Sequence, residues 1–262
     1  MIRALYTAAT GMQAQETNID VISNNLANVN TTGYKKSRAD FQDLMYQYLL
    51  EPGAQTSATT NSPSGIQVGL GVKTAAVQKI FTQGDLSSSS NPMDLAIEGD
   101  GFMQVTMPDG TTSYTRAGSL QLNKDGALVT SEGYLIQGAS TIPPDALAVS
   151  IAEDGNVTYR LSGQAAAQAA GQISGARFPN NAGLRAIGRN LYQESDASGN
   201  AVAGTFAQQG FGRLQQGFIE SSNVSVVDQV VSLITAQRAY EANSKGISTA
   251  DEILSQAINL KR

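Results

Sequence analysis

Three carboxylates in one short stretch of the sequence raise the first question about chemistry. Asp94, Glu98 and Asp100 stand close together, just before Phe102. If Glu98 and Asp100 lay on one strand, their side chains would share a face about 6.5–7 Å apart, a separation that a glycosidase can use. Asp94 and Asp100 also lie in a glycine-rich stretch, and aspartate near glycine is typical of turns. The sequence favours turns over catalysis.

Three Asp-Gly pairs resemble fragments of a calcium-binding loop. Asp109-Gly110, Asp125-Gly126 and Asp154-Gly155 lack the further oxygen ligands that such a loop needs. Each pair stands between runs of alternating polarity, which is the signature of a β-hairpin. The run Gly69-Leu70-Gly71 lacks both the third glycine of a dinucleotide fingerprint and the spacing of a phosphate loop.

Histidine and cysteine are both absent from the 262 residues. Their absence excludes Ser-His-Asp and Cys-His catalysis, disulfides, thiolate metal sites and iron–sulfur clusters. We therefore predict no catalytic residue, no metal and no cofactor. The net charge of −5 leaves no basic excess to neutralise nucleic-acid phosphates, so no nucleic-acid partner is expected. The sequence contains no run of about 18 apolar residues, so we expect no helix that spans a membrane. The N-terminus does not resemble a signal peptide.

Charged residues make up only 15% of the chain, against about 25% in an ordinary soluble domain. A surface so poor in charge is weakly protected against association. Either the protein associates non-specifically, or partners cover much of its surface.

Both ends of the chain show the periodicity of long amphipathic helices. The N-terminal seam repeats every seven residues in two rows, Leu5, Met12, Ile19 and Leu26, and Ala8, Gln15, Ile22 and Val29. The C-terminal seam has the rows Val226, Leu233, Tyr240, Ile247 and Leu254, and Ala236, Asn243, Ala250 and Ala257. Ser225 is a suitable N-cap, and Lys261 and Arg262 would complement the dipole of the helix end. Gly11 and Gly246 mark either close backbone approaches or weak points.

Val227, Val230, Val231 and Ile234 widen the apolar stripe of the C-terminal helix beyond a two-helix seam. Such a stripe is exposed unless another surface covers it. Two arrangements remain open on the pattern alone. The helices either pair with each other and with other copies of the chain, or pack on the chain's own middle region.

The middle of the chain has the period of two that is typical of strands. Alternating runs separated by turn signals predict an antiparallel β domain over residues 75–195. Residues 47–72 are rich in Gly, Ser, Thr, Pro and Gln and predict a linker or long excursion, and residues 162–176 are ambiguous. The predicted fold class is α+β and mostly β, with coiled-coil-like terminal helices around an inserted β domain.

Two motifs at the expected ends of the chain resemble the signatures of bacterial flagellar rod and hook proteins. The N-terminal one is SNNLANVNTTGYK at residues 23–35, and the C-terminal one combines SNV at 222–224, AQRAYE at 236–241 and NSK at 243–245. The signature residues that we carry over are Asn24, Asn25, Asn28, Gly33, Tyr34, Gln237, Arg238, Tyr240 and Glu241. The total length, together with the runs at 1–12, 91–102 and 114–118, is similar to the distal-rod branch of that family. Residues 46–72 resemble the extra stretch of a stiff rod.

The resemblance implies a structural, self-assembling subunit and no enzyme. It implies an inner core of residues 1–35 with 217–262, a connecting region of 36–74 and 196–216, and an outer β domain of 75–195. Many copies would form a rigid hollow drive shaft that carries motor torque through the periplasm to the hook. The assembly interface would comprise Leu5, Met12, Ile19, Ile22, Leu26, Val29, Val226, Val230, Leu233, Tyr240, Ile247 and Leu254.

The same resemblance implies the partners and the location. The partners would be other copies of the chain, proximal rod proteins, the hook protein or a hook-side neighbour, the P- and L-ring bushing, and the flagellar type III export machinery. The location would be the basal body, from the periplasm through to the outer membrane, without a cleaved signal peptide. The alternatives are a proximal rod or short hook protein and, from another class, a cell-wall glycan hydrolase.

Overall fold

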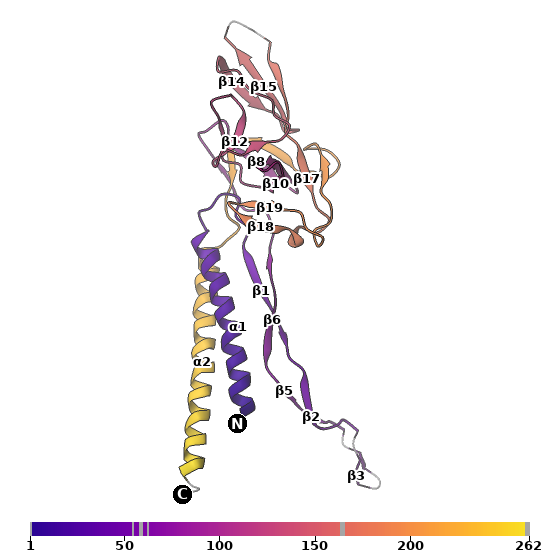
Figure 1. Ribbon diagram of the computed structural model, residues 1–262, viewed down its shortest axis with the longest axis vertical. Coiled ribbons are helices and arrows are strands. Elements are labelled where there is room, and N and C mark those ends of the chain that lie inside the picture. Colours follow the sequence, from indigo (N-terminus) through magenta and orange to yellow (C-terminus); the bar gives the residue numbers. More distant parts are fainter. Residues whose placement is uncertain (1, 54, 58–59, 62, 163–165, 260–262) are drawn as a thin grey trace. The chain divides into compact units, whose positions relative to one another are not determined.

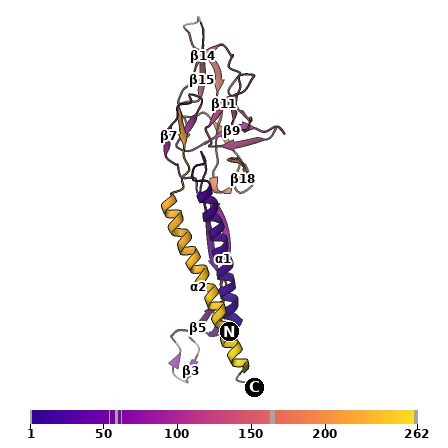
Figure 2. The ribbon, with the colours of Figure 1, turned by 90° about the vertical axis from the view of Figure 1, so that its left-hand side faces the viewer.

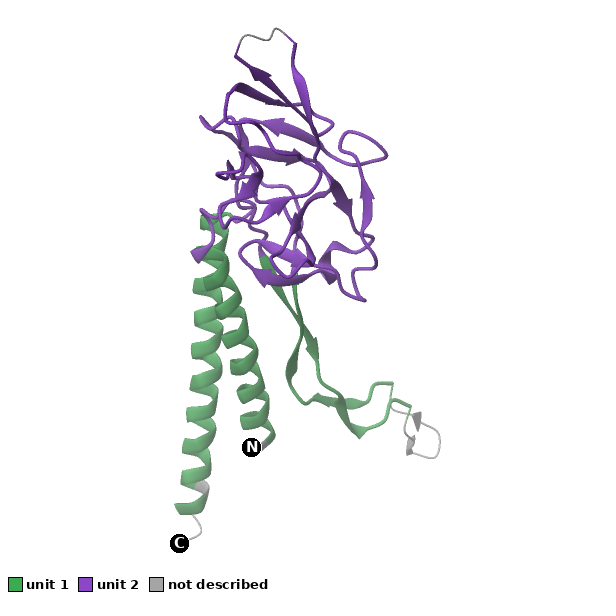
Figure 3. Ribbon diagram, turned by 45° about the horizontal axis from the view of Figure 1, so that its top comes forward, with its two compact units in different colours: residues 1–26, 37–78, 225–262 green, residues 27–36, 79–224 purple. Residues whose placement is uncertain are grey.

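The computed structural model describes residues 2–53, 55–57, 60–61, 63–162 and 166–259. Within these residues the chain is mostly β, with a long helix near each end. It divides into two compact units, which Figure 3 shows in different colours. The helical unit comprises residues 1–26, 37–78 and 225–262, and the β unit comprises residues 27–36 and 79–224. Lys261 and Arg262, which we expected to complement the dipole at the end of the C-terminal helix, lie outside the described residues.

Two helices, α1 (Ile2–Ala27) and α2 (Val226–Asn259), lie side by side in the helical unit (Figures 1 and 2). Neither contains proline, so each can run for many turns. The N-cap prediction is confirmed, because the Asp228 backbone N–H donates to Ser225 Oγ at 3.4 Å. The helix α1 ends at Ala27, a few residues earlier than the apolar repeat predicts.

The rest of the helical unit is an antiparallel β ribbon. In chain order its strands are β1 (Ser37–Asp43), β2 (Tyr46–Leu50), β3 (Gln55–Ser57), β4 (Thr60–Asn61), β5 (Ile66–Gly69) and β6 (Val72–Lys79). β1 pairs with β6, β2 with β5, and β3 with β4, which makes successive two-stranded sections (Figure 1). The stretch that composition marked as a linker is therefore ordered as ribbon over its described residues. Exposed polar side chains are compatible with a ribbon because backbone pairing holds it together.

The β unit is built around a nine-stranded sheet. Along its main path the order is β11-β12-β13-β9-β10-β19-β18, and β17 pairs with both β9 and β20. These strands are β9 (Phe102–Thr106), β10 (Thr112–Thr115), β11 (Leu120–Leu122), β12 (Leu128–Thr130), β13 (Leu135–Ile136), β17 (Gly175–Arg177), β18 (Arg185–Gly188), β19 (Leu191–Gln193) and β20 (Val202–Gly204).

Smaller sheets complete the β unit. A three-stranded sheet has the order β14-β15-β16, β8 pairs with β21, and β7 pairs with β22. Their strands are β7 (Leu86–Ser88), β8 (Leu95–Glu98), β14 (Ala146–Ile151), β15 (Asn156–Leu161), β16 (Gln168–Gln172), β21 (Arg213–Gln216) and β22 (Phe218–Glu220). The ambiguous stretch at 162–176 thus supplies β16 and the start of β17, apart from residues 163–165, which lie outside the described part.

The three Asp-Gly hairpins are confirmed. Each pair lies in the turn between two paired strands, β9–β10, β11–β12 and β14–β15. In all three turns the glycine has a positive φ, between 78° and 86°, which side chains with a Cβ rarely adopt. Asp109 Oδ1 accepts from the Thr111 backbone N–H at 2.9 Å, so the carboxylate serves its own turn.

The core lies on both faces of β9, whose residues 102–105 are all buried. Met103 and Val105 belong to the larger apolar cluster, with Leu95, Ile97 and Leu214 from β8 and β21. The opposite face carries an aromatic cluster in which the rings of Phe102 and Phe178 pack edge to face at 5.8 Å. β9 is therefore a central strand with two covered faces.

Candidate assembly interface

The helix α2 carries apolar side chains on two opposite faces. One face includes Ala236, Leu233 and Asn243, which are buried or half-buried. At about 3.6 residues per turn, Val227 and Val231 point the other way, and they are 73% and 59% exposed. Ile234 lies on the same outer face and is also exposed. The outer face is the apolar surface of α2 that the subunit leaves uncovered.

Exposed apolar side chains are concentrated in the helical unit. Among the described residues, all but four of the exposed large apolar side chains belong to it, and the four in the β unit are Leu122, Leu135, Leu147 and Val202. The helical unit has few deeply buried side chains of its own, chiefly Ala14, Ile22, Asn25, Ala236 and Ala250. An apolar surface of this extent is typical of a protein that associates.

The structure places the predicted interface residues unevenly. On α1, Ile22 is buried, while Leu5, Met12, Ile19 and Leu26 are half-buried. On α2, Leu233, Ile247 and Leu254 are half-buried, and Val226, Val230 and Tyr240 are exposed. Val29 lies beyond the end of α1, in a turn of the β unit. The predicted interface residues of α1 and α2 therefore lie in the helical unit, whereas Val29 lies in the β unit.

Gly11 and Gly246 differ in their surroundings. A Cβ atom on residue 11 would lie 2.9 Å from Asn243 Nδ2, so Gly11 marks a close approach of the two helices. A Cβ on residue 246 would meet nothing within 4 Å. The glycine of α1 is explained by contacts inside the subunit, and the glycine of α2 is not.

Among the signature residues, Asn25 has the most clearly defined role. It is 2% exposed, and its amide donates to the Ser37 carbonyl oxygen at 2.8 Å and to Gln229 Oε1 at 3.2 Å. Asn25 Oδ1 accepts from the Ser37 backbone N–H at 2.8 Å. The side chain thus connects α1, the start of β1 and the first turn of α2 within the helical unit.

Other signature residues lie in the β unit. Gly33 has a φ of +68°, and a Cβ there would lie 2.7 Å from the Ala117 backbone nitrogen. Tyr34 is buried, with Lys79 Nζ 4.8 Å from the centre of its ring. Asn28 Oδ1 accepts from Thr31 Oγ1 at 3.2 Å in the turn that follows α1. The remaining signature residues, Asn24, Gln237, Arg238, Tyr240 and Glu241, are exposed on the two helices.

A buried ionic cluster in the β unit was not predicted from the sequence. Glu220 accepts from Lys35 Nζ at 2.6 Å and from Arg116 Nε at 3.0 Å, and all three residues are almost fully buried. Burial raises the pKa of the Glu220 carboxyl, but the charges of Arg116 and Lys35 outweigh it and hold the pKa below its usual value. Burial and the nearby Arg116 lower the pKa of Lys35. Lys35 and Glu220 fall within or beside the two motifs, but nothing in the sequence pairs them.

The three carboxylates near Phe102 have structural surroundings. Asp94 accepts from Ser89 Oγ at 2.5 Å and from the Asn91 amide at 2.8 Å, which makes it a turn residue. Glu98 ends β8, and Asp100 follows it in the turn before β9. The two do not lie on one strand, so the premise of the glycosidase hypothesis is wrong.

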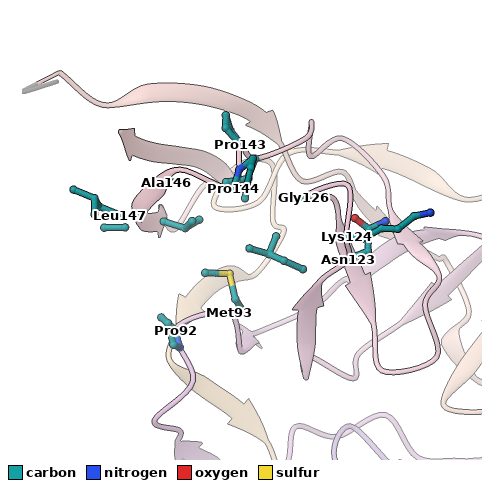
Figure 4. A pocket seen from close by; sticks show the side chains of 13 residues that line it. Pro92, Met93, Asn123, Lys124, Gly126, Pro143, Pro144, Ala146 and Leu147 are labelled. Atoms are coloured by element: carbon teal, nitrogen blue, oxygen red, sulfur yellow. The ribbon is translucent and has the colours of Figure 1, made fainter. Parts of the chain in front are cut away.

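The β unit also contains an open groove of about 430 Å³ beside β14 (Figure 4). Pro92, Met93, Pro143, Pro144 and Leu147 are among the residues that line it, and Lys124 is its single titratable side chain. Such a lining offers no acid–base pair for catalysis. In the described part of the chain, no cluster of acidic residues could hold a metal ion, and no helix combines the length and apolar character needed to cross a membrane.

Comparison with known proteins explains this combination of helices and β unit. The model of the family described as "Flagella basal body rod protein" matches residues 5–35, that of "Flagellar hook protein FlgE/F/G D1 domain" matches 96–159, and that of "Flagellar basal body rod FlgEFG protein C-terminal" matches 215–260. The flagellar basal-body rod protein FlgG of Caulobacter vibrioides is 49% identical over 99% of this chain and 100% of its own length. The chain belongs to the FlgG family of flagellar basal-body rod proteins.

A hook protein is a weaker match than the FlgG relatives. The flagellar hook protein FlgE of Helicobacter mustelae is 42% identical over 53% of this chain, but only 31% of that protein is covered. A crystal structure of the Helicobacter pylori flagellar hook protein FlgE2 matches over 71% of this chain and 43% of the FlgE2 chain. The sequence identity is 16% and the TM-score is 0.25.

Membership of the FlgG family settles the class of function. The chain is a structural subunit of the flagellar rod, a part of the basal body, and not an enzyme.

Proposed function

We propose that this FlgG-family protein forms the distal part of the rod, where many copies assemble into a rigid hollow helical shaft that transmits motor torque to the hook. The ribbon of residues 37–79 supports the distal assignment, because it contains the stretch that resembles the extra segment of stiff rods. A proximal rod protein or a short hook protein remains the alternative within the family.

The outer face of α2 is the observation that carries the proposal. Val227 and Val231 are exposed in the single subunit, and burying such a side chain contributes about 1.5–3 kcal/mol. A helix that packs on α1 with one face and presents a second apolar face can contact a neighbouring copy. We infer that coiled-coil-like packing of α1 and α2 forms the inner core. The assembly interface would combine the outer face of α2, with Val227, Val231 and Ile234, and a second set of residues, of which Val29 lies in the turn after α1. This second set comprises Leu5, Met12, Ile19, Ile22, Leu26, Val29, Val226, Val230, Leu233, Tyr240, Ile247 and Leu254.

The proposal includes a division of labour along the chain. Residues 1–35 with 217–262 would build the inner tube, residues 36–74 and 196–216 would connect it, and residues 75–195 would face outwards. The outer part would meet the P- and L-ring bushing in the periplasm and at the outer membrane. Proximal rod proteins and the hook side would contact the two ends of the shaft, and the type III machinery would export the subunit.

Electron microscopy of basal bodies tests the assignment. A strain that lacks this protein should retain the proximal rod and lose the distal rod, and the wild-type chain should restore it. Loss of the whole rod would favour the proximal alternative, and an intact rod without a hook would favour the hook alternative.

A pair of matched substitutions tests the interface. Val231→Asp should prevent rod formation because an unpaired carboxylate is costly to bury, while the purified subunit keeps its melting temperature. Val202→Asp is the control, because Val202 is 56% exposed, close to the 59% of Val231, but lies in the β unit. Normal rods built from Val231→Asp subunits would contradict the proposed interface.

A further inference from the structure

The chain passes between its two units at four places. The crossings follow residues 26, 36, 78 and 224. A force that acts on the helical unit can reach the β unit along the chain at these crossings. The residues that anchor the crossings in each unit are therefore of mechanical interest.

In the β unit, one side chain anchors three of these crossings. Asn223 Oδ1 accepts from the Lys36 backbone N–H at 2.8 Å. Its amide donates to the carbonyl oxygens of Ile80 at 2.9 Å and of Thr82 at 3.1 Å. The Ile80 backbone N–H in turn donates to the Lys36 carbonyl oxygen at 2.9 Å. Segments that border the crossings after residues 36, 78 and 224 are thus bound together at Asn223.

The buried ionic cluster reinforces the same three segments. Glu220 lies three residues before Asn223, and its carboxylate accepts from the Gly84 backbone N–H at 2.9 Å as well as from Lys35. Lys35 Nζ also donates to the Thr82 carbonyl oxygen at 2.7 Å. Arg116 fixes the cluster to the sheet, because its guanidinium donates to Glu220 and to the Gly101 carbonyl oxygen at 3.1 Å.

In the helical unit, Asn25 has the corresponding position. It bonds Ser37 in both directions and reaches Gln229. These three residues border the crossings after residues 26, 36 and 224. Each unit therefore has one asparagine whose side chain joins three segments next to the crossings.

In both asparagines the side-chain NH2 group donates to at least two acceptors, and Oδ1 accepts a backbone N–H. Breaking such an arrangement would leave polar groups without partners, and that loss is larger for buried groups than for exposed ones. Between the anchors only short stretches of chain remain, such as the single peptide bond from Lys36 to Ser37. A twist applied to one unit is therefore resisted at both ends of the links after residues 36 and 224, and at one end of the links after residues 26 and 78.

We propose that Asn25 and Asn223 are torque-transmitting anchors, which hold the crossings rigid so that rotation of the helical unit is passed to the β unit. This inference rests on the proposed function of the protein as a shaft subunit. It assigns to two asparagines of the terminal motifs a mechanical role rather than a role in contacts between subunits.

The experiment compares Asn25→Ala and Asn223→Ala with Asn123→Ala in motile cells. Asn123 is a matched control, because its Oδ1 accepts from the backbone N–H groups of Asp125 and Ala127 inside one hairpin turn of the β unit. Rods are counted and measured by electron microscopy, and swimming speed is followed as the medium is made more viscous. We expect both anchor variants to build rods in normal number but to lose speed several-fold at high load, while the control follows the wild type.

The melting curve of the purified full chain shows whether each anchor variant still folds. Asn223→Asp is a second variant at the same anchor. Asn223→Asp retains the acceptor for Lys36 and removes the bonds that the amide donates to Ile80 and Thr82, so it should share the defect under load. Anchor variants whose speed follows the wild type at every viscosity would overturn the inference. So would anchor variants that fold and are exported but build no rod, because the asparagines would then serve assembly. If the wild-type chain itself builds no distal rod, the proposed function fails instead.

Discussion

Gly11 of α1 faces Asn243 of α2 so closely that a Cβ atom on residue 11 would lie 2.9 Å from Asn243 Nδ2. Gly246, three residues further along α2, has nothing within 4 Å of the same hypothetical atom. Glycine within a helix costs about 1 kcal/mol relative to alanine. The subunit structure accounts for that cost at residue 11 and leaves it without a reason at residue 246.

Alanine substitutions at the two glycines should therefore differ. Gly246→Ala should stabilise the purified subunit by up to about 1 kcal/mol, because the new methyl group meets no neighbour. Gly11→Ala should gain less, because the Asn243 side chain has to move. Urea denaturation followed by the helical circular dichroism signal measures both changes. Equal gains at both positions would show that the contact between Gly11 and Asn243 is not made in solution.

The Glu220 carboxylate should be one of the most sensitive positions of the β unit. Glu220→Gln would leave the buried cations Lys35 and Arg116 without their counter-charge, and breaking a buried ion pair in this way costs about 3–5 kcal/mol. Glu98→Gln is the control, because Glu98 is exposed and its carboxylate accepts one bond from Gln215 at 2.9 Å. The free energies of unfolding of the full-length variants should differ clearly. A loss for Glu220→Gln no larger than that for Glu98→Gln would contradict this account.

The same cluster predicts how stability depends on pH on the acid side. The pKa of Glu220 is lowered in the folded chain from its ordinary value of 4.5, so the unfolded chain binds the proton more tightly. The contribution of Glu220 is then fully present above that ordinary value and is lost as the pH falls through the folded value. The melting temperature of Glu220→Gln should vary less with pH in this range than that of the wild type. Parallel curves for the two proteins would count against the lowered pKa.

On the alkaline side, Lys35 should make stability rise with pH. Its pKa is lowered from the ordinary value of 10.5, with burial as the main cause. Between the folded and the ordinary value the unfolded chain binds more protons, so folding becomes more favourable as the pH increases. Lys35→Met should reduce this rise without abolishing it, because burial also lowers the pKa of Lys79. Thermal melts are kept below about pH 9, because a tyrosine has an ordinary pKa of about 10. An unchanged slope in Lys35→Met would contradict the assignment.

Local patterns predicted much of the fold, for physical reasons that particular residues make clear. The three Asp-Gly turns depend on a few neighbouring residues, and each hairpin forms where its turn signal stands. The start of α2 is equally local, because Ser225 caps its own helix. The ribbon at 46–69 was missed because its pairing involves backbone groups of strands with exposed, mixed side chains, which leave no clear alternation.

The polar anchors could not be predicted because their partners are far apart in the sequence. Glu220 and Lys35 are separated by 185 positions, and Asn223 and Ile80 by 143. The sequence alone does not show whether a charged residue in a motif is buried, because burial requires a counter-charge whose position is known only from the fold. The motifs indicated which residues matter, and only the fold shows that Asn25 and Asn223 join separate segments.

The ribbon offers a test of stiffness that is separate from folding. Tyr48 and Leu49 in β2 are more than half exposed, so replacing both by threonine should leave the melting temperature of the subunit nearly unchanged, since threonine also favours strands. In an assembled shaft these side chains would be covered by neighbouring copies, and their loss would remove apolar contacts that hold rows of subunits together. The shaft should then bend more easily, which electron micrographs of isolated rods measure as increased curvature.

Gln47→Thr is the control in the same strand, because it removes an exposed polar side chain instead. Rods of the double variant that are as straight as those of the wild type would show that the ribbon does not stiffen the shaft, and a lowered melting temperature would show that it contributes to folding.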